Sequence, residues 1–176
     1  TFDSGAIEVV SRADPQDIRR RLRADNAAEF RQWFHFRVLG AGGKPLRMVF
    51  ENAAEAAYAD GWPGYRCVAS YDRQNWFRVS GTRYEDGQLI VEHTPERDSI
   101  FYAYFEPYSH ERHLDLLCRA EMSPFARVLN LGATVEGRDL DLVVVGRPTP
   151  EREPVWSIAS QHPGVTMAEW VVEGLL

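Results

Sequence analysis

Two histidines flank a short charged segment, His110-Glu111-Arg112-His113, which resembles the HExxH pattern of helical zinc sites. In that pattern the histidines are at positions i and i+4, so both imidazoles face one metal ion. Here the two histidines are at i and i+3, and the sequence does not identify an acidic side chain that would complete a metal site with them. We therefore interpret the segment as a polar helix face, with His113 packing on the β-sandwich that the preceding sequence predicts.

The other residues that could bind a metal are isolated. Cys67 and Cys118 lie in no CxxC or Cys/His spacing that would form a structural metal site. Two free thiols in a chain long enough to build its own core are typical of a reduced, cytoplasmic compartment. His35 and His93 occur singly on predicted strands, where we expect structural or exposed positions.

Tyrosines and turn carboxylates are the remaining candidates. Tyr102, Tyr104 and Tyr108 would either line a substrate approach in an intact enzyme or pack in the core and between domains. The acidic residues near predicted turns, which need no catalytic role, are Asp72, Glu85 and Asp86. The sequence contains no G-x-S-x-G motif, P-loop or dinucleotide fingerprint.

Composition excludes several classes of partner. The chain has 176 residues, of which 44% are hydrophobic and 12% aromatic, and a net charge of −6. A nucleic-acid partner is not expected, because phosphates attract basic surfaces. No apolar run reaches the roughly 18 residues of a membrane span, and the first residues show no signal-peptide pattern. We expect a cytoplasmic protein.

Short alternating segments joined by turns indicate an antiparallel β-sandwich. Apolar residues alternate in Trp33–Leu39 and in Leu46–Glu51, and the glycine-rich segment Gly40–Gly43 between them predicts a hairpin. The arginine-rich segment Asp14–Asp25 has no clean period, and it is compatible with a short helix or an irregular edge.

A second hairpin is predicted around the dipeptide Asp86-Gly87, because both residues tolerate the positive φ of a tight turn. Its arms would be Trp76–Val79 and Leu89–Glu92. The aromatic run Ser99–Phe105 predicts a further strand.

The character of the sequence then changes. Ser109 is a suitable N-cap for a helix with an apolar stripe formed by Leu114, Leu117 and Cys118. Ser123-Pro124 ends this helix.

Further strands and a helix are predicted towards the C-terminus. Val128–Gly132 and Leu140–Val145, joined by a turn at Glu136–Asp139, predict a hairpin, whose second arm resembles a strand buried on both faces. Val155–Ser160 predicts another strand, and Thr166 is expected to cap a last helix through Leu176.

Three stretches carry a resemblance to a known family: Phe101–Ser109, Gly132–Leu142 and Gln161–Trp170. The early segments Phe2–Gly5 and Asp60–Trp62 add to it. Together they resemble the cytosolic carboxypeptidase family of zinc metallocarboxypeptidases, best in its bacterial branch. The similarity covers essentially the whole chain, and the order and separation of the motifs make it specific.

The resemblance implies a mainly β chain. An N-terminal antiparallel β-sandwich that ends in a linking helix would span residues 1–120, and a partial α/β carboxypeptidase-type segment, the truncated start of the catalytic domain, would span 125–176. It also implies hydrolysis that removes C-terminal residues, glutamates in some members, from peptides or proteins. In the family, a His-Pro-Gly-Glu motif supplies two zinc ligands. A downstream histidine, a general-base glutamate and a carboxylate-binding arginine complete the site.

This sequence departs from that pattern at position 165. It reads His162-Pro163-Gly164-Val165, and an isopropyl group cannot ligate zinc. His162 is therefore expected to be a vestigial single ligand, and Glu169, one helical turn further on, is not expected to replace the missing glutamate. With the downstream segment also outside the chain, we assign no catalytic or cofactor-binding residue. We expect no stoichiometric zinc and no activity of this chain alone.

A non-catalytic role is the alternative. The predicted strand Val155–Ser160 would lack sheet neighbours, and residues such as Val143, Val145 and Trp170 would lack a covering layer. Exposed strand edges and apolar patches favour pairing with another chain. The alternative is therefore a protein-binding or self-associating β-sandwich module, a homo-oligomer formed through an exposed strand edge.

Overall fold

The computed structural model describes residues 2–147, 149, 153–162 and 164–176. The chain forms two compact units. The first comprises residues up to Pro107 together with His162–Thr166, and the second comprises Tyr108–Gln161 and Met167–Leu176. The predicted domain limits at residues 120 and 125 stay a prediction.

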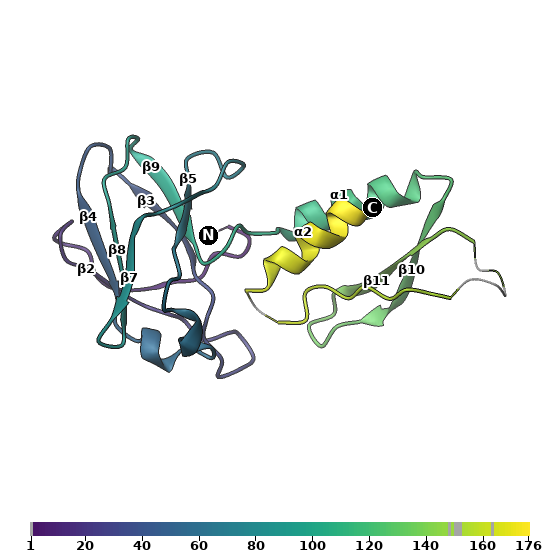
Figure 1. Ribbon diagram of the computed structural model, residues 1–176, viewed down its shortest axis with the longest axis horizontal. Coiled ribbons are helices and arrows are strands. Elements are labelled where there is room, and N and C mark those ends of the chain that lie inside the picture. Colours follow the sequence, from purple (N-terminus) through teal and green to yellow (C-terminus); the bar gives the residue numbers. More distant parts are fainter. Residues whose placement is uncertain (1, 148, 150–152, 163) are drawn as a thin grey trace. The chain divides into compact units, whose positions relative to one another are not determined.

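The first unit contains two sheets (Figure 1). Within the described residues, the larger sheet has five strands, in the order β1 (Glu8–Ser11), β2 (Ile18–Arg21), β4 (Leu46–Phe50), β8 (Gln88–His93) and β7 (Gly81–Glu85). The smaller sheet has four, in the order β3 (His35–Leu39), β9 (Ser99–Ala103), β5 (Val68–Ser70) and β6 (Phe77–Arg78). Neighbouring strands are antiparallel except β2 and β4, which are parallel. The short 3-10 helices η1 (Ala53–Glu55) and η2 (Ala59–Gly61) follow β4. The predicted β-sandwich is confirmed.

Aromatic side chains from both sheets form the core between them. Phe34, just before β3, and Phe50 on β4 have ring centroids 4.6 Å apart, and Phe36 stacks on Tyr102 at 5.6 Å. Trp62 is fully buried, and its indole Nε1 donates to the carbonyl of Ala53 at 2.8 Å. Satisfying that polar atom allows a large ring to be buried without a desolvation penalty.

The first predicted hairpin is wrong. Residues Trp33–Leu39 contribute β3 and Leu46–Glu51 contribute β4, but these strands belong to different sheets. Both present alternate apolar residues to the same core, and the Gly40–Gly43 loop crosses from one sheet to the other. A period of two identifies a half-buried strand but not its partner.

The second hairpin has the predicted turn but a different first arm. Asp86 and Gly87 have φ of 49° and 77° and join β7 to β8. The predicted arm Trp76–Val79 instead contributes β6, which pairs with β5. The strand at the turn, β7, is a partly exposed edge strand without strong apolar alternation.

The arginine-rich segment Asp14–Asp25 contains strand β2 rather than a helix. Its alternation places Ile18 and Arg20 inward and Arg19 outward. The guanidinium of Arg20 lies over the Phe36 ring, 4.2 Å from its centroid, and burial lowers the pKa of Arg20 to about 10. Arg20 therefore occupies an inward position that an apolar side chain usually fills, and its cation–π contact with Phe36 favours this burial.

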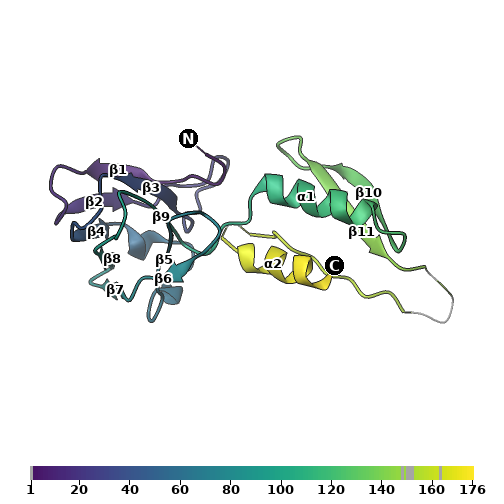
Figure 2. The ribbon, with the colours of Figure 1, turned by 90° about the horizontal axis from the view of Figure 1, so that it is seen from above.

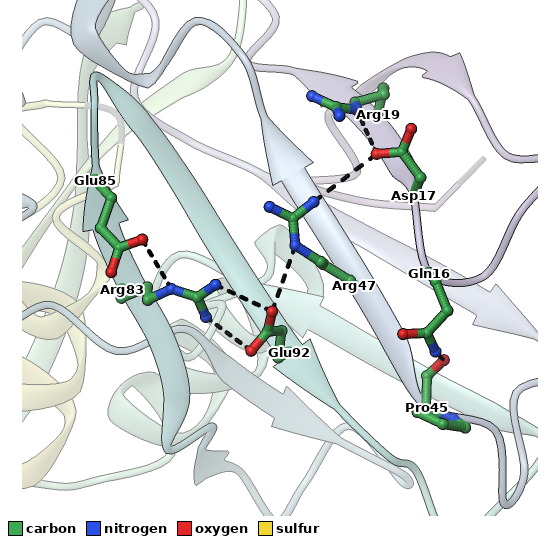
Figure 3. Close-up of polar contacts among 8 residues, drawn as sticks. All are labelled: Gln16, Asp17, Arg19, Pro45, Arg47, Arg83, Glu85 and Glu92. Carbon is green, nitrogen blue, oxygen red and sulfur yellow. Dashed lines mark hydrogen bonds and ion pairs between the residues drawn. The ribbon is translucent and has the colours of Figure 1, made fainter.

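Opposite charges form a row across the outer face of the larger sheet (Figure 3). Arg83 contacts both oxygens of Glu92 at 2.8 and 3.0 Å, and Arg47 Nε lies 3.4 Å from the same carboxylate. Asp17 lies between Arg47, at 3.8 Å, and Arg19, at 2.6 Å. Each exposed pair contributes little to stability, but the row covers the sheet with balanced charge.

The second unit consists of α1 (His110–Glu121), β10 (Ala126–Ala133), β11 (Asp139–Val145) and α2 (Thr166–Leu175), most of which belongs to it. The two helices lie side by side (Figures 1 and 2). Ser109 is the N-cap of α1, and its hydroxyl accepts from the amide of Arg112, as predicted. Strands β10 and β11 form the predicted antiparallel hairpin.

Three expectations for this unit are wrong. The buried residues of α1 are Leu116 and Ala120, not the predicted stripe. Strand β11 is partly or fully exposed along its length rather than buried on both faces. No strand forms in the described residues 153–162, where Val155–Ser160 was expected to be one. β-branched composition predicts an extended backbone, but a strand also requires a hydrogen-bonded neighbour.

Candidate metal centre

The segment from His162 to Thr166 forms a tight turn at the start of α2. The Val165 amide donates to the carbonyl of His162 at 3.3 Å, and Gly164 has a φ of +84°. The side chain of His162 is exposed, whereas Val165 is partly buried. Pro163 lies outside the described residues. The turn thus brings positions 162 and 165 close together along the backbone, as a two-ligand motif requires.

The sandwich holds this turn by close packing at Gly164. A Cβ added there would lie 3.2 Å from two ring carbons of Tyr104 and 3.7 Å from Trp33. The hydroxyl of Thr166, the first residue of α2, donates to the carbonyl of Glu106 at 2.8 Å. Glycine is required at position 164 both for its left-handed backbone and for its proximity to the tyrosine ring.

Tyr104 is itself fixed by several contacts. Its hydroxyl accepts from Gln32 Nε2 at 3.1 Å, and its ring packs edge-on against Trp33 with centroids 6.4 Å apart. The indole of Trp33 donates to the carbonyl of Ser4 at 2.7 Å. Burial raises the pKa of Tyr104 above its ordinary value, so the phenol stays neutral. Tyr104 therefore has a packing role.

The other two tyrosines also pack. Tyr102 is fully buried in the core, and its hydroxyl lies 2.9 Å from Nδ1 of His93. Tyr108 belongs to the second unit, where its ring meets that of Trp170 edge-on at 5.2 Å. Of the two roles considered for these residues, packing agrees with their surroundings.

The residues present do not fit a zinc ion. Among the described residues, no group of three or more His, Cys, Asp or Glu side chains is placed to hold a metal. His162 has no second donor at position 165. Glu169 is hydrogen-bonded to the Ser160 side chain, and desolvation raises the pKa of its carboxyl. A catalytic zinc requires three protein ligands and an open position.

The segment that resembled HExxH has a structural role. Nε2 of His113 lies 3.1 Å from the carboxylate of Asp141, and this contact joins α1 to β11. The rings of His110 and His113 stack with centroids 6.0 Å apart. The interpretation as a polar helix face holds, but His113 packs on the hairpin of its own unit rather than on the sandwich.

A charged cluster that the sequence did not reveal holds α2 against α1. The guanidinium of Arg112 makes two contacts of 2.7 and 2.8 Å with Glu173 and lies 4.1 Å from the Trp170 ring centroid. Arg119 adds a third contact to Glu173 at 2.9 Å. Hydrogen bonding between these groups raises the pKa of Arg112 and lowers that of Glu173. The residues are about sixty positions apart, so sequence spacing could not indicate the pairing.

Both cysteines are free, with Cys67 buried and Cys118 exposed. Burial raises the pKa of the Cys67 thiol well above its ordinary value, so it is unreactive. None of the helices in the described part of the chain is long and apolar enough to span a membrane.

Comparisons with known proteins agree with the fold. A metallo-carboxypeptidase from Burkholderia cenocepacia is 54% identical, with a TM-score of 0.93 over 99% of this chain and 46% of its own. A metallo-carboxypeptidase from Pseudomonas aeruginosa is 44% identical, with a TM-score of 0.91 over 99% and 46%. An uncharacterised protein of Zymomonas mobilis subsp. mobilis is 42% identical over 175 residues, which are 99% of this chain and 45% of that protein.

The chain thus spans less than half the length of these relatives. The family model described as the cytosolic carboxypeptidase N-terminal domain matches residues 1–105, which are more than half of the chain and nearly the whole of the sandwich unit. The chain therefore belongs to the cytosolic carboxypeptidase N-terminal domain family.

Proposed function

We propose that this chain is the N-terminal β-sandwich and the first part of the catalytic domain of a zinc metallocarboxypeptidase-like protein. In relatives with an intact site, the reaction would remove C-terminal residues, glutamates in some cases, from peptides or proteins. The family assignment supports the reaction class, and the two metallo-carboxypeptidase structures match the chain over 99% of its length.

The observation that carries the proposal is the anchored turn at His162–Thr166. The ring of Tyr104 packs against Gly164, and the backbone carbonyl of Glu106 accepts a hydrogen bond from the hydroxyl of Thr166. These contacts fix the backbone on both sides of position 165, where the related motif has a metal-ligating glutamate. In relatives with a glutamate at this position, the sandwich would therefore support the turn that orients both ligands.

We further propose that the 176-residue chain neither binds zinc stoichiometrically nor hydrolyses peptides. Valine at position 165 supplies no electron pair, and the described residues provide no three-donor group. A single exposed imidazole is a weak metal ligand, because zinc affinity depends on several converging donors.

Zinc titration of matched variants tests this proposal. In competition with a chromogenic chelator, the parent chain should hold far less than one zinc per chain. Val165→Glu should bind zinc more tightly by at least about tenfold, because a second donor joins the imidazole. Val165→Gln, of similar size but a poor ligand, should behave like the parent. One tightly held zinc per parent chain would refute the proposal.

Self-association is a second candidate function. Among the described residues, the β10–β11 hairpin pairs with no further strand, so both of its outer edges are open. Large apolar side chains in the same unit are exposed, including Leu131 at 58%, Val145 at 62%, Val155 at 95% and Trp156 at 70%. Open edges with apolar surroundings favour strand addition by another copy of the chain. The sequence predicted an exposed strand edge at Val155–Ser160, where the described residues form no strand. The open edges now proposed for association are those of β10 and β11.

Sedimentation velocity across a hundredfold concentration range measures this association. The parent chain should sediment faster as its concentration rises. Trp156→Glu should shift the equilibrium towards the monomer, because it places a charge on the exposed apolar surface. Glu111→Ala, an exposed change on α1, should not. A concentration-independent monomer would exclude the candidate.

A further inference from the structure

A cavity of about 370 Å³ opens on the sandwich, and none of its lining residues belongs to the turn at His162. It lies beside β6 and the end of β8. The residues that line it combine aromatic rings with carboxylates and small polar groups: Tyr71, Asp72, Asn75, Phe77, His93, Thr94 and Glu96. Its volume falls within the range of about 300–1,000 Å³ that small-ligand sites occupy.

The aromatic wall is held in a defined arrangement. The rings of Tyr71 and Phe77 are 5.7 Å apart and tilted by 37°, and Phe77 meets His93 edge-on at 5.8 Å. The Tyr71 hydroxyl accepts from the amide of Glu96 at 2.9 Å, and His93 Nδ1 is hydrogen-bonded to Tyr102. Because these contacts join the walls to the core, the cavity does not need to be ordered by a ligand.

The cavity is negatively charged. Hydrogen bonds from the backbone and side chain of Asn75, and from Gln74, hold the pKa of Asp72 well below its usual range. Burial lowers the pKa of His93, so its imidazole is neutral at pH 7. Glu96 provides a second carboxylate, and the described lining residues include no lysine or arginine.

No ion pair within the described chain neutralises this charge. Glu92, nearby on β8, is neutralised by Arg83 and Arg47 in the row of ion pairs (Figure 3). Asp72 and Glu96 take part in no ion pair among the described residues. The larger sheet thus balances the charge of its outer face, whereas the two carboxylates at the aromatic cavity, which follow β5 and β8, form no such ion pair.

We propose that this cavity binds a guanidinium group, as the side chain of an arginine residue in a peptide or protein. A planar guanidinium stacks on aromatic faces and is more weakly hydrated than an ammonium, so it suits a cavity with rings and carboxylates together. The chain uses the same contact internally: Arg20 lies 4.2 Å from the Phe36 centroid, and Arg112 lies 4.1 Å from that of Trp170. The proposal is independent of the metal-site turn, so either can fail alone.

Titration of the ¹⁵N-labelled chain with N-acetyl-L-arginine amide tests the proposal. Saturable shifts of the Asn75, Thr94 and Glu96 amides are expected, with a dissociation constant on the order of millimolar, because an open site gains only modest cation–π and charge energies. N-acetyl-L-citrulline amide, of similar shape but uncharged, should leave these amides in place. The proposal would be overturned by equal shifts with both probes or by shifts confined to other amides. It would also be overturned if the arginine probe caused no shifts even at low ionic strength, where charge attraction is least screened.

Two variants separate the contributions of charge and ring. Glu96→Gln and Phe77→Ala should each weaken binding of the arginine probe by about two- to fivefold. Glu8→Gln, which removes the same charge from an exposed position on β1, should not change it. Each variant's amide spectrum verifies that the sandwich is folded. Undiminished binding by both folded cavity variants would refute the assignment of this cavity.

Discussion

Acidification should destabilise the sandwich through one buried histidine, His35. Its side chain is 1% exposed, and Nδ1 lies 2.9 Å from the Ser4 hydroxyl. Nε2 has no hydrogen-bond partner among the described residues. Burial, together with the positive charge of Arg73, lowers the pKa of His35 to about 4, and Asp3 opposes this shift only weakly. The native state therefore holds the imidazole neutral.

The sign and size of the effect follow from proton linkage. Between pH 6.5 and 4 the unfolded chain binds a proton at His35 and the native chain does not, so stability falls as pH falls. A shift from 6.5 to about 4, at about 1.4 kcal/mol per unit, corresponds to about 3 kcal/mol. The loss is small at pH 7 and nearly complete at pH 4.

Urea unfolding followed by circular dichroism at several pH values measures this loss. Carboxylates titrate in the same range, so the comparison is with His35→Asn, whose amide can still reach Ser4. The parent should lose about 3 kcal/mol more than this variant between pH 7 and pH 4. His110→Asn, an exposed change, should keep the parental pH profile. Parallel profiles for the parent and His35→Asn would refute the reasoning.

Two further changes test the turn and the helix pair. Gly164→Ala should destabilise the chain by about 1–2 kcal/mol, because alanine is strained at positive φ. Gly174→Ala, in open space on α2, should instead stabilise it by about 0.5–1 kcal/mol. Thermal unfolding measures both changes, and equal effects on stability would contradict the role of the turn. Glu173→Ala should cost about 1 kcal/mol by leaving Arg112 unpaired, a value reduced by the exposure of that arginine. Amide hydrogen exchange in α2 should be faster in Glu173→Ala than in the parent, and unchanged in the control Glu111→Ala. Unchanged exchange in both variants would count against the pairing.

Features with a local cause could be predicted from the sequence. Asp86-Gly87 indicates a tight turn because both residues accept positive φ, and the structure has that turn. Ser109 predicts the start of α1 because its hydroxyl can accept a free backbone amide. In each case the determinant and its effect lie within a few residues.

Strand partners could not be predicted, because pairing is decided by distant segments. Strands β3 and β4 share one alternating pattern, yet each pairs in a separate sheet. Strand β2 carries arginines at three successive positions, and the inward-facing Arg20 lies over the Phe36 ring of a distant strand. The pattern of one strand contains no information on the ring that will lie opposite.

The candidate site shows the same division. A motif identified His162 and the substitution at Val165, since both lie in one short turn. The packing of Tyr104 under Gly164 and the partners of His35 could not be predicted, because they come from segments more than thirty residues away.

The hydrogen bond from Thr166 to Glu106 spans 60 positions of the chain. Closing a loop of that length costs entropy of about 4 kcal/mol, so we expect the contact to form after the sandwich surface that receives it. The turn that carries His162 would then take its native position after the sandwich has folded. During synthesis the ribosome must deliver the whole intervening helix and hairpin before His162 can reach its place.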